Sequence, residues 1–128
     1  MQTNRCVTFK AQRRNHLREL VVPKYLTVGY GDRAGYDRTP KAIRDLAHEQ
    51  DAKLRSEGAV MGIAGKPVCV RNPDAASVEI TAGPFMSAEL PVAGFALIEA
   101  ADMEDAIRKV SSVPCAVAHG VVEVWPIE

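Results

Sequence analysis

The pattern of apolar positions predicts short strands separated by turns. Five runs are rich in β-branched and aromatic residues or are nearly all apolar, which is typical of strands. A further run alternates apolar and polar residues, as a half-buried strand does. Gly-Pro, Asn-Pro and Gly-Lys-Pro sequences between the runs indicate turns. The strand ranges are 24–30, 59–64, 68–71, 77–81, 94–100 and 120–125.

Two segments have helical spacing instead. The first begins at Thr39-Pro40, where the threonine can cap free amides and the proline suits the first helical position, and it ends at Gly58. The second follows Asp102, and Asp105 three residues later suits a capping box. The apolar faces are Ile43, Leu46, Ala47, Gln50 and Leu54 in the first helix and Met103, Ala106, Ile107 and Val110 in the second.

The order strand, helix, several strands, helix, strand predicts an α+β fold. We expect a ferredoxin-like sandwich, with an antiparallel sheet and two helices on one face. Residues 94–100 are nearly all apolar, so this strand should be central. Helices on one face leave the other face uncovered, and a second subunit packed there would bury it. The sequence therefore predicts a homodimer.

Composition adds a basic leader to this picture. The chain has 128 residues and a formal net charge of zero. Residues 1–24 hold six basic groups and one acid, and the rest holds ten basic groups and fifteen acids. We interpret 1–22 as an N-terminal extension and 23–128 as one domain. Without aromatic interleaving or a binding motif, the basic charge does not predict a nucleic-acid partner.

Other bulk features point to a cytoplasmic protein. No apolar run has the length of a membrane span, and the N-terminus lacks a signal-peptide core. Cys6, Cys69 and Cys115 fit neither a disulfide framework nor a zinc pattern. The three histidines share no metal-ligand spacing, and phosphate-loop and dinucleotide motifs are missing. We expect no metal and no cofactor.

A set of short motifs in fixed order carries a family resemblance. The motif residues are Thr81, Gly83-Pro84-Phe85, Gly94-Phe95, Leu97-Ile98-Glu99, Asp102, Ala106, Val122-Glu123-Val124 and Pro126. Over residues 23–128 the chain resembles the YCII-related family, in its DGPF-type branch. The resemblance implies a dimeric α+β barrel with a cleft between sheet and loops. Three positions depart from the family pattern, because Ala82 replaces an acid, Glu89 a lysine and Trp125 an arginine.

The resemblance implies two different kinds of function. Members of the wider family are proposed to use a histidine with an acid, which implies a small enzyme. DGPF-type members look like partners of sigma-factor regulation, which implies an accessory domain linked to transcription. Glu99 and Glu123 occupy family-typical acidic positions.

His48 is the first candidate for acid/base chemistry. Together with Arg44, Asp51 and Arg55 it forms a stripe on the first helix, off the apolar face. Asp51, one turn away, could orient the imidazole and raise its basicity. The alternative is a solvated ladder of surface charges.

His119 is the second candidate, because it directly precedes the last strand and could work with Glu123 in the cleft. The alternative is an exposed loop histidine. A carboxylate on a buried sheet face needs a cationic partner or a raised pKa. Arg71 and Arg108 are the candidate partners for Glu99 and Glu123.

Large side chains near the turns are candidates for the wall of a small-molecule pocket. Tyr30, Phe85 and Trp125, with Phe95 and Met61, could form this wall or be plain core. We expect Phe85 to fold back beneath its loop and fill the end of the core. The candidate ligand-binding residues are Tyr30, Arg71, Phe85, Glu89 and Trp125, and the candidate catalytic residues are His48, His119 and Glu123.

Two function hypotheses remain open. One is a small-ligand-binding or accessory domain with a cleft at its sheet. The other is a small acid/base enzyme acting on an aromatic or lactone-like molecule. The missing acid at Ala82 and the missing arginine at Trp125 favour binding.

Overall fold

Four strands form one antiparallel sheet in the order β2-β5-β1-β6 in the computed structural model, which describes residues 22–128. β1 and β5 are the interior strands, so the expected central position of residues 94–100 is confirmed. β1 pairs along its whole length with both neighbours, and its register with β5 shifts between Gly29 and Tyr30. The strands are β1 (Lys24–Tyr30), β2 (Val60–Ile63), β5 (Val92–Glu99) and β6 (Val121–Ile127).

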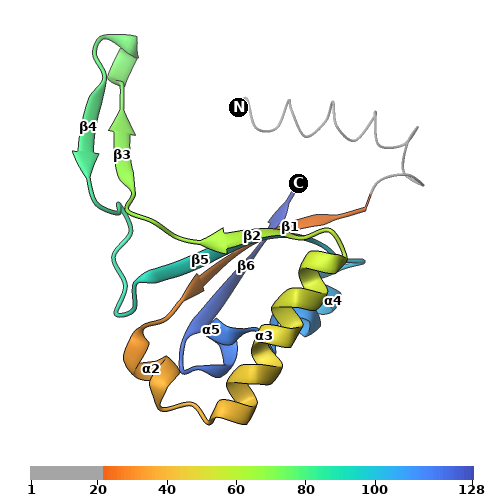
Figure 1. The fold of residues 1–128 in the computed structure, drawn as a ribbon. Helices are drawn as coiled ribbons and strands as arrows, with labels where there is room; N and C mark the ends of the chain where they lie inside the picture. Colours follow the sequence, from red (N-terminus) through yellow and green to blue (C-terminus); the bar gives the residue numbers. More distant parts are fainter. Residues whose placement is uncertain (1–21) are drawn as a thin grey trace.

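The helices lie on one face of this sheet (Figure 1). They are α2 (Arg33–Asp37), α3 (Lys41–Ser56), α4 (Met103–Val110) and α5 (Pro114–Val117). The core lies between helices and sheet, and Ile98, Leu54 and Ala106 are its most buried members at 2%, 2% and 0% exposure. The structure is thus a mixed α+β fold with a four-stranded antiparallel sheet, as expected.

The ends of the two long helices show one correct and one wrong capping prediction. Asp102 accepts from the Asp105 amide at 2.8 Å, so the expected Asp102 cap is present. The Asp105 carboxylate accepts from the Ala101 amide at 2.9 Å, one residue before the amide that a capping box uses. Thr39 does not cap α3, because Pro40 is the N-cap. The Thr39 hydroxyl instead donates to the Gly35 carbonyl at 2.8 Å, which closes the end of α2.

α2 and α5 occupy segments to which the sequence pattern assigned neither a helix nor a strand. Asp32 caps α2 by accepting from the Gly35 amide at 2.9 Å. Pro114 opens α5 at the first helical position. The expected apolar face of α3 is correct in part: Ala47 and Leu54 are buried, whereas Ile43 and Leu46 are 43% and 63% exposed.

Two further strands form a separate hairpin, which we call the arm (residues 66–83). β3 (Val68–Arg71) pairs antiparallel with β4 (Glu79–Ala82), and the short 3₁₀ helix η2 (Pro73–Ala75) lies in the turn between them. The arm projects from the sheet on the side away from the helices (Figure 1). Every residue of β4 is exposed, so the expectation of a half-buried strand at 77–81 is wrong. The alternating pattern is real, but no element of the described chain covers it.

The turn after the arm is another correction. Gly83 has a φ of 100°, in the left-handed region, and its amide donates to the Pro67 carbonyl at 3.0 Å. The strand ends in a bend there, as the Gly-Pro sequence predicts. Phe85 does not fold back into the core, since it is 86% exposed. The loop after Gly83 joins the arm to β5, and core packing of Phe85 does not support the turn.

The sheet face opposite the helices, which we call the open face, is formed by the strand residues that alternate with the core-facing ones. Tyr25, Ala96 and Ile98 belong to the core, so Leu26 and its cross-strand neighbours Leu97 and Trp125 point the other way. The same register assigns Lys24, Val28, Tyr30, Val60, Phe95, Glu99, Val121, Glu123 and Ile127 to the open face. The predictions for residues 1–21, including the basic leader, lie outside the described residues.

Candidate functional site

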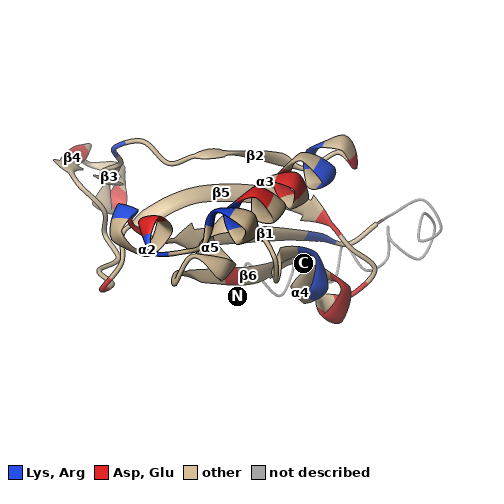
Figure 2. Ribbon diagram, turned by 60° about the horizontal axis from the view of Figure 1, so that its bottom comes forward, with Lys and Arg blue, Asp and Glu red and all other residues tan. Residues whose placement is uncertain are grey.

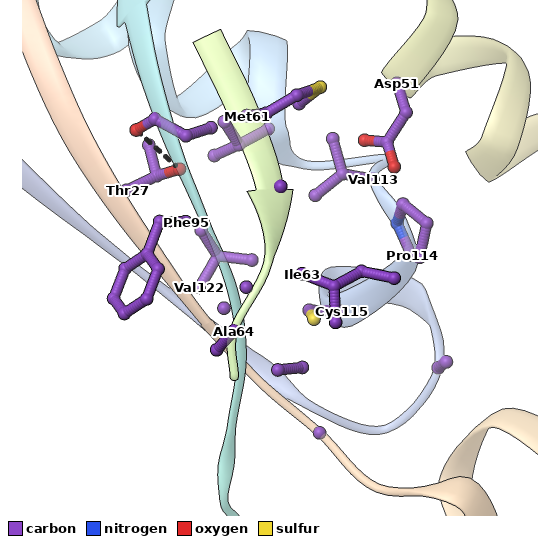
Figure 3. Close-up of a pocket in the computed structure, with 18 of the residues that line it drawn as sticks. Thr27, Asp51, Met61, Ile63, Ala64, Phe95, Val113, Pro114, Cys115 and Val122 are labelled. Carbon is purple, nitrogen blue, oxygen red and sulfur yellow. Dashed lines mark hydrogen bonds between the residues drawn. The ribbon is translucent and has the colours of Figure 1, made fainter. Parts of the chain in front are cut away.

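A hollow of about 790 Å³ lies on the helix side of the sheet. Its floor comes from β1 and β5, where Thr27 donates to the Ala96 carbonyl at 3.3 Å. Figure 3 shows Met61 and Ile63 of β2, with Val113 and Cys115 from the α5 region, around this space. Met61, Val113 and Cys115 make apolar walls of the kind that suits a small organic molecule, whereas Ile63 is 94% exposed.

Polar side chains gather at the rim of the hollow. α3 contributes His48, Asp51 and Arg55, whose spacing of three and four residues places them on one side of the helix. α2 contributes Arg33 and Tyr36, and its N-cap contributes Asp32. The hollow therefore combines apolar walls with a few polar groups, which is the usual composition of a ligand site.

Tyr36 and His48 form the most specific contact at the rim. A hydrogen bond of 2.8 Å joins the Tyr36 hydroxyl and His48 Nε2. With a neutral imidazole that is unprotonated at Nε2, the phenol donates this bond. The Arg44 guanidinium lies 4.9 Å from the centre of the Tyr36 ring and stacks on it. This contact holds the ring beside His48.

Asp51 does not orient His48 through a hydrogen bond in the way we expected. Among the described residues its carboxylate has no hydrogen-bond partner, and the imidazole bonds to Tyr36 instead. Burial raises the pKa of Asp51, and the positive charges of Arg55 and His48 partly oppose this rise. Asp51 is thus a half-buried acid in the wall of the hollow (Figure 3).

Cys115 is a wall residue rather than a nucleophile. Burial raises the pKa of its thiol, and the negative charge of Asp51 raises that pKa further. A thiol that keeps its proton is a poor nucleophile and a good apolar contact. Its sulfur packs against Gly29, where an added Cβ would lie only 2.8 Å away.

A second constellation lies on the open face, across the sheet from the hollow. Tyr30 donates from its hydroxyl to Glu123 Oε1 at 2.9 Å, and Trp125 Nε1 donates to the same oxygen at 3.3 Å. The hydrogen bond to Glu123 is the main cause that raises the pKa of Tyr30. Tyr30, Glu123 and Trp125, which we singled out from the sequence, are therefore brought together. His48 lies elsewhere, at the rim of the hollow.

The partners expected for the two family-typical acids are wrong. Glu99 pairs with Lys24 at 2.7 Å, and this bond is the main cause that lowers the pKa of Glu99. Glu123 is held by Tyr30 and Trp125. Arg108 pairs with Asp105, one turn away on α4.

The remaining candidates are dispersed. His119 is exposed in the turn before β6, with a φ of 63°, and its Cβ lies beside Gly35 rather than near Glu123. Arg71, Phe85 and Glu89 are exposed, on the arm or in the loop after it. The sequence pattern assigned no helix to 31–37, so Tyr36 and Arg33 were missed. The Asp32 cap with Gly35 three residues later is the signal that could have revealed α2.

Neither metal binding nor membrane crossing is supported by the described residues. Within 22–128, no group of three or more His, Cys, Asp or Glu side chains is arranged to hold a metal ion. None of the helices in this range is both long and apolar enough to cross a membrane. A scan against protein-family models finds no match, and a search of curated proteins finds no similar sequence.

Proposed function

We propose that the protein binds a small, partly aromatic molecule in the hollow between the sheet and α3. The observation that carries this proposal is the hollow itself, about 790 Å³ with apolar walls and a polar rim on one side. This volume falls in the usual range for sites that enclose a small ligand. Met61 and Val113 would contact the apolar part of the ligand, and His48 and Arg55 would contact its polar end.

The fold behind this proposal is a ferredoxin-like sandwich of the YCII-related kind. The four strands of the main sheet follow one another as β-α-β-β-α-β, with α3 in the first crossover and α4 with α5 in the second. The motif residues 94–99, in the interior strand β5, support the same family. An accessory role in transcription rests on the resemblance alone.

We further propose a homodimer that buries the open face. Leu26, Phe95 and Trp125 on this face are 38%, 48% and 54% exposed. Figure 2 shows that charged residues lie mainly on the helices and at strand ends, whereas most of the sheet is uncharged. An exposed apolar sheet face of this kind is typical of an interface. The dimer should bury more than about 1,000 Å² in total.

Blocking the hollow tests ligand binding. We would screen small aromatic acids, phenols and lactones such as coumarin by thermal shift. A compound at one hundred times its Kd adds about 2.7 kcal/mol of stability, which raises Tm by several degrees. Ala64→Trp, in the wall of the hollow, should abolish the shift. The matched control Ala76→Trp, in the exposed turn of the arm, should keep it. A shift that survives Ala64→Trp would place the ligand elsewhere.

The second candidate function is a small acid/base enzyme that uses the same hollow. The Tyr36–His48 hydrogen bond of 2.8 Å favours it, because a phenol and an imidazole in contact can pass a proton. Tyr36→Phe and His48→Ala should then abolish turnover of a bound lactone while its thermal shift remains. If turnover of every bound compound is absent in the parent protein, binding is the function.

A further inference from the structure

The arm has two chemically different faces. Residues directly opposite each other in a hairpin share a face, and successive residues alternate between faces. One face therefore carries the pairs Val68–Ala82 and Val70–Ile80, and the other carries Cys69–Thr81 and Arg71–Glu79. Alternation adds Val78 to the apolar side. Such a clean division is expected of a sheet that buries one face.

Nothing in the described chain buries that apolar face. Val68, Val70 and Ile80 are 60%, 63% and 68% exposed. An isolated two-stranded hairpin is marginally stable in water, and an exposed apolar hairpin invites association. The hairpin is paired down to its base, where Gly83 N–H donates to the Pro67 carbonyl. Just below the arm, Ala64 N–H donates to the Ala93 carbonyl and continues the pairing of β2 with β5. The arm is thus a paired projection whose apolar face lacks a partner in the described residues.

The direction of the arm indicates where the partner lies. The helices cover one side of the sheet and the arm rises on the other side (Figure 1). That other side is the open face, so a molecule seated on the open face has the arm at its flank. Each chain therefore presents two apolar surfaces, the arm and the open face, on the same side of the sheet.

A second copy of the chain would cover both apolar surfaces at once. In a two-fold dimer every contact occurs twice, so both arms and both open faces are covered together. The two surfaces expose ten large apolar side chains, between 38% and 71% each. Such a set supplies on the order of 800 Å² per copy, the usual share in a stable interface. These side chains are Leu26, Val60, Phe95, Val121, Trp125, Ile127, Val68, Val70, Val78 and Ile80.

The net charge of the chain also favours a second copy as the partner that covers these two surfaces. The formal net charge of the chain is zero, so two copies do not repel each other. The alternative cover is the chain's own leader, but residues 1–21 contain five arginines and lysines in a short stretch. A strongly basic segment is a poor cover for an apolar surface, because its charges would lose hydration without acidic partners.

We propose that the arm is a dimer clasp: its apolar face packs on the flank of a second copy seated on the open face, and the two arms hold each other's subunit. This inference rests on the homodimer proposed above. It adds that the arm, and not the sheet alone, contributes to association.

Sedimentation analysis of the full chain separates the two proposals. Phe95→Lys, on the open face, should yield a monomer. Val70→Lys/Ile80→Lys, on the apolar face of the arm, should raise the dimer Kd by about tenfold or more, because two lysines would be brought against apolar surface. Thr81→Lys, on the polar face of the same strand, should leave Kd unchanged. Val70, Ile80 and Thr81 lie in the arm, outside the main sheet, whereas Phe95 lies in β5. Circular dichroism checks that each variant is folded.

Chemical cross-linking then identifies the contact. Two variants would be prepared with native cysteines replaced by serine, one with Ile80→Cys on the arm and one with Leu26→Cys on the open face. A short bis-maleimide should join the two variants when they are mixed, and dilution below the dimer Kd should abolish the product.

The outcomes are distinct. A dimer that tolerates the lysine pair on the arm and gives no mixed cross-link would overturn the clasp while keeping the dimer. A parent chain that stays monomeric at all concentrations would overturn both. A further Ile80→Cys variant would keep Cys6 and have only Cys69 and Cys115 replaced by serine. A monomer in which this variant gives an intrachain cross-link to Cys6 would assign the arm to the leader and overturn the clasp.

Discussion

The strands of the main sheet and of the arm have the same kind of sequence but differ in burial. Ile98 in β5 and Ile80 in β4 are both β-branched residues in antiparallel strands, yet they are 2% and 68% exposed. α3 and α4 cover the first, and no element of the described chain covers the second. Apolar alternation therefore specifies the strand and its two faces. Burial depends on whether a segment distant in sequence arrives to cover one of those faces.

The largest contrast should appear when each isoleucine is truncated. Ile98→Ala removes buried methyl groups and should cost about 3–4 kcal/mol of unfolding free energy. Ile80→Ala should cost less than about 1 kcal/mol in dilute protein, where the chain is a monomer. Urea unfolding of both variants measures the difference. Equal losses would mean that the arm is covered within its own chain.

Replacing a glycine by alanine should give the second-largest difference in stability between the sheet region and the arm. A Cβ at Gly120 would clash with the carbonyl oxygens of Tyr30 and Cys115, where the turn before β6 meets the sheet. Gly120→Ala should therefore cost about 1–3 kcal/mol through backbone displacement. At the root of the arm, Gly65 has no atom within 4 Å of an added Cβ. Gly65→Ala should leave Tm almost unchanged, and a large loss there would show that the root is packed.

A smaller effect should come from the half-buried acid of the hollow. The raised folded-state pKa of Asp51 means that the folded protein holds this proton to higher pH than the unfolded chain. Its contribution favours folding below the ordinary carboxyl pKa and is lost as pH rises through the folded pKa. Asp51→Asn should therefore stabilise the protein at neutral pH, and the gain should vanish in acid. Urea titrations across this pH range test the sign, and a loss of stability at neutral pH would contradict burial as the dominant cause.

The smallest effect concerns Phe85, near the arm. Because its side chain is 86% exposed, Phe85→Ala should change the unfolding free energy by less than about 0.5 kcal/mol. Calorimetry at low protein concentration measures this change. A loss of 3 kcal/mol or more, as expected for a buried aromatic, would restore the role in the core that the sequence suggested.

Local sequence signals were reliable for the backbone. The strand at 24–30, the central strand near 94–100, the Asp102 cap and the bend at Gly83 all follow from nearby residues, and the structure has each of them. Capping and turn chemistry act over a few residues, which is why sequence reasoning can reach them. The Thr39 cap failed because α2 offered the Thr39 hydroxyl a competing acceptor, the carbonyl of Gly35 four residues earlier.

Contacts between distant segments were not predictable in the same way. His48 meets Tyr36 because α2 and α3 turn back on each other, and a stripe on one helix gives no hint of that partner. Tyr30, Glu123 and Trp125 were singled out separately, and only the register of β1 with β6 joins them. Phe85 and β4 look like core in sequence because the pattern does not reveal that the arm leaves the sheet.

Hydrogen–deuterium exchange over a series of protein concentrations tests the contrast between sheet and arm most directly. The amides of β1 and β5 should be protected at every concentration, because their cover belongs to the same chain. The amides of β3 and β4 should exchange fast in dilute protein and become protected in step with dimer formation. Arm amides that exchange at one rate across the whole series would contradict a clasp, and with it the view that a second copy supplies the missing cover.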